Sequence, residues 1–194
     1  MAAIAGSLVS VQALGSEPMR AIEREVIAAY LNTLEPDQSF GKALVIERTT
    51  ATTDEAFGPI GLARGREQLA KELPQASERG LDDFLRVLAK PSPLWIPGQL
   101  VRRNLRLQMA RASDVDRLFD ANKLGAAWER FYKAYPDAVG LVRISRVGID
   151  EQTSQALFYM SLRQGGLRGS GHFALLHRPL GVWRVLATAQ AWVS

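Results

Sequence analysis

Four successive segments with strand character fill the last third of the chain, and they constrain the fold more than any other feature. They are Val139–Gly148, Ser154–Leu162, Gly171–His177 and Val182–Trp192. From Trp183 onward, apolar side chains alternate with more polar ones, which is typical of a strand with one buried face. The short connections between the segments are typical of hairpins. We therefore predict a C-terminal four-strand antiparallel meander.

Helical periodicity occupies much of the preceding sequence. Apolar residues at helical spacing predict helices over Met19–Leu34, Arg64–Leu73, Gly80–Lys90, Ser113–Phe119 and Leu124–Tyr132. Strand-forming residues predict two more strands, over Ala43–Glu47 and Leu100–Met109. We therefore predict an α+β fold, in which a mainly antiparallel sheet with the C-terminal meander is packed on one side by the N-terminal and central helices.

Residues 1–16 differ from the rest of the chain because they are almost all small or apolar. They resemble the later part of a secretory signal peptide, although a positively charged start is missing. They are too short and too weakly hydrophobic for a transmembrane span. We predict a single domain over residues 17–194, preceded by an apolar tail or a signal-peptide remnant. Export to the periplasm or the medium follows from this interpretation, and a cytoplasmic location is the alternative.

The chain contains no cysteine, and this excludes disulfides, thiolate metal sites and cysteine nucleophiles. The net charge is +4, and the whole excess lies in residues 139–194, which hold six arginines against Asp150 and Glu151. Such a surface could attract a small anionic ligand or an acidic protein surface. The alternative is a set of solvated or ion-paired arginines. We do not expect nucleic-acid binding, because the sequence shows no dense basic cluster and no nucleic-acid-binding motif.

A glycine-rich segment, Gln164-Gly-Gly-Leu-Arg-Gly-Ser170, joins two of the predicted strands. It is neither a dinucleotide-binding fingerprint nor a P-loop, because it precedes a strand and not a helix. Glycines permit positive φ, and such a loop can direct several N–H groups toward an anion. The predicted binding residues are therefore Gly166, Arg168, Gly169 and Ser170, together with Tyr159 and His172 on the adjoining strands. The alternative is a wide hairpin loop that needs glycine for its turn.

The two histidines, His172 and His177, are five residues apart on one predicted strand. An odd separation places them on opposite faces of the sheet, so we predict no metal site and no cofactor. His172 could act with Tyr159 or Ser170 across the hairpin, or could simply be a buried, hydrogen-bonded residue. Glu47, at the end of a predicted strand, is a possible acid or base, and a polar turn is the alternative.

The region from Trp128 onward resembles a family of uncharacterised small bacterial proteins that are often exported. The resemblance rests on "WERFYKAYPDAVGLVRISRVGID", "TSQALFYMSLRQGGLRGSGHFALLHR" and "GVWRVLATAQAWVS". These stretches contain a Trp-x-x-Phe-Tyr helix, a Ser-Arg-Val-Gly strand, a Gln-Ala-Leu strand, the glycine-rich loop and a closing Trp-Val-Ser. Many family members carry cysteines in and near the loop, where this chain has Arg168. The resemblance implies the fold, the loop and export, and it supplies no activity.

The absence of a catalytic motif leads us to predict a small, non-catalytic binding or interaction domain. The alternative is a pocket-based hydrolase or isomerase of unknown substrate, with Tyr159, His172 and Glu47 as its candidate residues. A deep cavity that holds a carboxylate with a shifted pKa would favour the enzyme, and a flat basic surface would favour binding.

Overall fold

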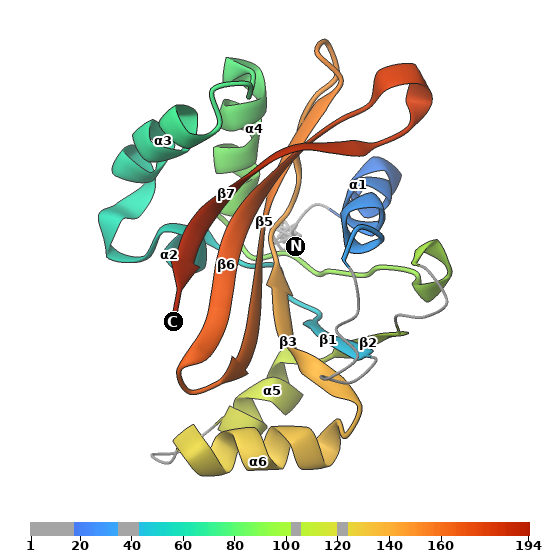
Figure 1. Cartoon of the computed structure of the whole chain (residues 1–194), viewed down its shortest axis with the longest axis vertical. Helices are drawn as coiled ribbons and strands as arrows, with labels where there is room; N and C mark the ends of the chain where they lie inside the picture. Colours follow the sequence, from blue (N-terminus) through green and yellow to red (C-terminus); the bar gives the residue numbers. More distant parts are fainter. Residues whose placement is uncertain (1–17, 35–42, 102–105, 120–123) are drawn as a thin grey trace, which may run out of the picture.

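The computed structural model describes residues 18–34, 43–101, 106–119 and 124–194, which form an α+β domain with helices around a central sheet (Figure 1). The strands are β1 (Ala43–Glu47), β2 (Arg106–Ala110), β3 (Ala138–Ile144), β4 (Gly148–Asp150), β5 (Gln155–Gly165), β6 (Arg168–His177) and β7 (Arg184–Val193). The helices are α1 (Ala21–Leu31), α2 (Thr53–Phe57), α3 (Gly61–Glu72), α4 (Glu78–Leu88), α5 (Ala112–Phe119) and α6 (Leu124–Ala134), with short 3-10 turns at Gly58–Ile60, Gly98–Leu100 and Pro179–Gly181. The expectations for residues 1–16 fall outside the described residues.

The described strands form a sheet in the order β2-β1-β3-β5-β6-β7, and the short β4 pairs with β5. The run β3-β5-β6-β7 is the predicted antiparallel meander. The segment predicted as one strand over Val139–Gly148 is two strands, β3 and β4, because the chain leaves the ladder between them. The α+β class is therefore confirmed, with one strand divided.

The sheet is mixed, because β1 pairs in parallel with both β2 and β3. Parallel neighbours need a long crossover connection. Helices α2 to α4 lie between β1 and β2 in the chain, and α5 and α6 lie between β2 and β3. The predicted helices thus act as crossovers, a consequence that strand patterns alone do not reveal.

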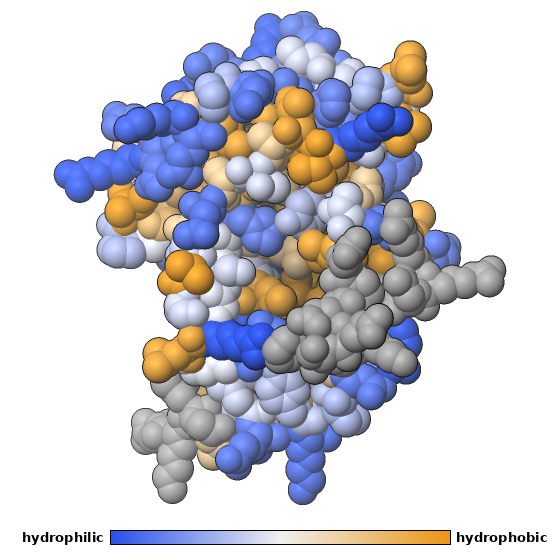
Figure 2. Space-filling view, viewed as in Figure 1, coloured by the Kyte–Doolittle hydropathy of each residue, from blue (hydrophilic) through white to orange (hydrophobic). Residues whose placement is uncertain are grey.

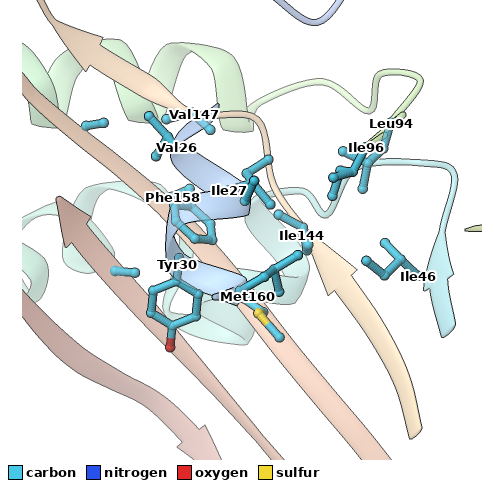
Figure 3. Close-up of a cluster of buried hydrophobic side chains, with 14 of the residues drawn as sticks. Val26, Ile27, Tyr30, Ile46, Leu94, Ile96, Ile144, Val147, Phe158 and Met160 are labelled. Carbon is cyan, nitrogen blue, oxygen red and sulfur yellow. The ribbon is translucent and has the colours of Figure 1, made fainter. Parts of the chain in front are cut away.

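Helices cover both faces of the sheet, so the prediction of packing on one side is wrong. Strand β5 contains the uninterrupted apolar run from Ala156 to Met160, which does not leave a polar face for solvent. Phe158 and Met160 pack with Ile27 and Tyr30 of α1 (Figure 3). The alternate side chains of β5 pack on the other face, in a cluster with α3 and α4.

Strand β7 changes faces along its length, because register shifts interrupt its pairing with β6. Trp183 and Val185 pack with the α1 cluster, whereas Ala187 and Ala189 pack with the cluster of α3 and α4. The prediction that the alternating apolar side chains from Trp183 onward share one buried face is therefore wrong. Each shift adds an unpaired residue to β7 and reverses the direction of the side chains that follow.

A third cluster closes one end of the sheet, where α5 and α6 pack on β1 and β3 (Figure 1). Trp128 and Phe131 of α6 meet Val45 of β1 and Leu141 of β3 there. On the face of the molecule shown in Figure 2, hydrophobic residues gather across the middle, with hydrophilic residues above and below.

Candidate functional site

A cleft of about 970 Å³ lies over the sheet between α2–α3 and α5–α6. Its volume is that of a pocket for a small molecule, since such pockets span roughly 300–1,000 Å³. Much of its wall is apolar, and this part includes Phe57, Leu69, Val115, Phe119, Trp128 and Phe173. Charged side chains from β1, β3 and β5 also reach it, namely Glu47, Arg143 and Arg163.

Two glutamates share one arginine in the wall of the cleft. Arg143 of β3 donates from Nη1 to Glu47 Oε2 at 2.6 Å and from Nη2 to Glu55 Oε2 at 2.9 Å. Glu47 ends β1 beside β3, and Glu55 lies in the first turn of α2. The capping interaction of Glu55 with the N–H of Thr52 at 3.1 Å fixes its orientation. Three elements therefore position this group.

Glu47 is only 4% exposed although it lines the cleft. Burial raises the pKa of its carboxyl group above the usual value, because the charged form loses contact with water. The Arg143 guanidinium opposes this rise, and the charges of Glu55 and Asp116 add to it. The Nε of Arg143 is buried and has no hydrogen-bond partner among the described residues. The two carboxylates thus hold the guanidinium of Arg143 in place, and they leave its Nε–H group without an acceptor among the described residues.

At another part of the cleft, the guanidinium of Arg163 stacks on the ring of Trp192, with its Cζ 5.6 Å from the ring centroid. The indole Nε1 of Trp192 donates to the hydroxyl of Tyr159 at 2.8 Å, and this hydroxyl donates to the carbonyl of Glu55 at 3.0 Å. The indole also lies against Gly171, where an added Cβ would be 2.3 Å from Nε1. The missing side chain at position 171 therefore makes room for the tryptophan.

The glycine-rich segment is a tight hairpin and not a wide loop. Strand β5 continues to Gly165 and β6 begins at Arg168, so only Gly166 and Leu167 form the turn. None of the segment's glycines has a left-handed φ, and the expected run of positive φ that would direct N–H groups toward an anion is therefore wrong. Gly166 and Arg168 still line the cleft.

The other predicted site residues are divided between the two faces. Gly169 and Ser170 belong to β6, and an added Cβ at Gly169 would be 3.2 Å from Trp192. Tyr159 is fully buried on the cleft side, where burial raises the pKa of its hydroxyl. His172 lies on the face of α1, with its Nε2 2.5 Å from the hydroxyl of Tyr30. The structure therefore does not bring His172 and Tyr159 together.

Sequence reasoning missed four residues of the cleft, namely Glu55, Arg143, Arg163 and Trp192. Glu55 could have been found as the acidic residue of a Thr-x-x-Glu capping box after the first strand. The alternation of β5 places Arg163 on the side of Tyr159. Trp192 could not be assigned to this face from the pattern, because a register shift next to Ala191 turns it toward the cleft.

Among the described residues, no three acidic or histidine side chains gather in a way that could hold a metal ion. No described helix is long and apolar enough to cross a membrane. Comparisons with protein-family models, with curated proteins and with solved structures find no significant match. The family resemblance of the C-terminal motifs therefore stays a prediction.

Proposed function

We propose that the protein binds a small organic ligand that combines an anionic group with an apolar part, and that the cleft is its binding site. The observation that carries this proposal is that Arg163 brings a positive charge to the cleft without an acidic partner among the described residues. Its side chain lines the cleft, stacks on Trp192 and forms no ion pair with any described residue. A guanidinium in this state retains several N–H donors for a carboxylate, sulfonate or phosphate group.

The rest of the cleft supports an apolar ligand body. Phe57, Phe119 and Trp128 supply aromatic surface from three different helices. Pockets for small molecules are commonly built this way, with apolar walls and a few polar groups that orient the ligand. The concave shape favours the small anionic ligand over the acidic protein surface, which would need a broad basic patch. The same cleft contains the buried carboxylate that the hydrolase or isomerase alternative requires.

Binding of anilinonaphthalene sulfonate tests this proposal, because the probe joins an aromatic body to one sulfonate. We expect Arg163→Gln to weaken its binding at least about tenfold, since a charge-assisted hydrogen bond contributes about 1.5–3 kcal/mol. Isothermal titration calorimetry gives the dissociation constants. The uncharged phenylnaphthylamine lacks the sulfonate, and its affinity should not change in the variant.

Arg178→Gln is the matched control. Arg178 stacks on Trp183 at 5.1 Å outside the cleft, so this variant removes the same kind of contact elsewhere. It should leave the affinity for both probes unchanged. Equal losses in the two variants, or an unchanged sulfonate affinity in Arg163→Gln, would contradict binding in the cleft. Near-ultraviolet circular dichroism confirms that each variant retains its packing.

A further inference from the structure

The carboxylate of Glu47 is placed for proton transfer inside the cleft. Its Oε2 accepts the hydrogen bond from Arg143, whereas its Oε1 accepts no hydrogen bond from any described residue. The residue is nearly removed from solvent and yet lines the cleft. One oxygen is therefore fixed, and the lone pairs of the other are available to a bound molecule.

Two features make this carboxylate a better base than one in water. Loss of hydration makes the charged form less stable, and the raised pKa of Glu47 reflects this effect. Glu55 holds Arg143, and Arg143 in turn holds the carboxylate of Glu47 in one orientation. Ligand binding therefore does not have to order this carboxylate. The carboxylate of Glu72 in the same cleft is exposed, and its hydrogen bond comes from Gln68 and not from an arginine.

We propose that Glu47 is a general base that removes a proton from an acidic C–H bond of the ligand in the cleft. The inference rests on the proposed binding function and adds the reaction that the bound ligand would undergo. The substrate class is a small carboxylate or similar anion with a C–H bond next to a carbonyl group. Proton transfer is the step that a single buried carboxylate can perform without a nucleophile or a metal ion.

The step is balanced without a co-reactant. The C–H bond breaks, its electron pair remains on the ligand, and an O–H bond forms on Glu47. Return of the same proton to a neighbouring atom of the ligand breaks the O–H bond and restores the carboxylate. The net reaction is an isomerisation, which gains and loses no atoms. It corresponds to the isomerase alternative and assigns Glu47 the central role.

Nitrobenzisoxazole is a suitable probe, because removal of its single acidic C–H proton breaks the N–O bond and releases a coloured cyanonitrophenolate. The wild-type protein should accelerate this elimination with saturation kinetics, and Glu47→Gln should lower kcat/KM at least about a hundredfold. Glu72→Gln is the matched control in the same cleft and should retain the wild-type rate. Glu47→Asp keeps a carboxylate on a side chain that is shorter by one methylene group, and should show an intermediate rate.

The pH profile gives a second readout. Only the ionised carboxylate accepts a proton, so the rate should rise as the pH passes the pKa of Glu47, which lies above the usual 4.5. Wild-type rates that match Glu47→Gln would overturn the inference, and so would an equal loss in Glu72→Gln. The elimination probe is uncharged, so its rate tests the role of Glu47, whereas the affinity for the sulfonate probe tests the role of Arg163. The two proposals can therefore fail separately.

Discussion

The contact between Tyr30 and His172 joins α1 to the sheet on the side away from the cleft. Burial raises the pKa of Tyr30 to about 12, so the residue keeps its hydroxyl proton, and this hydroxyl shares a hydrogen bond with Nε2 of His172. Burial also lowers the pKa of His172 below 6.5, because the charged imidazole would lose its hydration. The chain has only two histidines, and the other, His177, is half-buried.

We expect His172 to make the fold sensitive to mild acid. Below pH 6.5 the unfolded chain binds a proton at this residue more readily than the folded one, so stability falls as the pH falls toward the lowered pKa. His172→Gln should remove this part of the pH dependence, and His177→Gln should keep it. Urea denaturation across this pH range measures the effect. Identical pH profiles for the wild type and His172→Gln would contradict the prediction.

At the scale of one element, α1 is held to the turn between β3 and β4 by a fully buried carboxylate. Glu23 accepts two hydrogen bonds from Arg146 at 2.7 Å and one from the N–H of Val147 at 3.2 Å. Burial alone would raise the pKa of Glu23, but the bonds from Arg146, Val147 and Arg20 outweigh it and lower the pKa. The ionised form is therefore the form that the fold stabilises.

Glu23→Gln should destabilise the protein by about 3 kcal/mol, because it leaves the buried Arg146 without its counter-charge. The lowered pKa means that the stabilisation is present above pH 4.5 and is lost as the pH falls through the value of the folded state. The difference between wild type and variant in denaturant unfolding should shrink accordingly. Glu25→Gln, an exposed change on the same helix, should stay within about 0.5 kcal/mol of wild type. A similar loss in both variants would contradict this account.

At the scale of the whole molecule, β5 belongs to two of the apolar clusters. Phe158 lies in the cluster of α1, and Tyr159 lies in the cluster of α3 and α4. If β5 unfolds, both clusters lose the side chains that this strand contributes to them. The two faces of the sheet should therefore not unfold independently.

Phe158→Ala tests this coupling. It should cost about 3–5 kcal/mol through the cavity that it leaves. It should also lower the unfolding midpoint equally in near-ultraviolet and far-ultraviolet circular dichroism, which report side-chain packing and backbone structure. Coincident transitions in wild type and variant are expected. A second transition that the variant does not shift would show that the α3–α4 face folds by itself.

The meander could be predicted because its strands are neighbours in the sequence, and its pattern and turns are local. The parallel pairing of β1 could not, since it depends on where the crossover helices return the chain. The same limit applies to the cleft. Glu47 was recognisable as a carboxylate at a strand end, but its partner Arg143 is 96 residues away. Trp192 depends on a register shift that simple alternation does not contain.

The alternation of β5 also has a consequence for protein engineering. Arg163 contributes to the cleft, whereas its neighbour Leu162 packs with the α1 cluster. Arg163 and Gln68 are exposed cleft positions that belong to none of the apolar clusters, so substitutions there leave those clusters untouched. A combinatorial library confined to these positions would vary recognition on an unchanged scaffold, so selection for a new ligand need not compete with selection for folding.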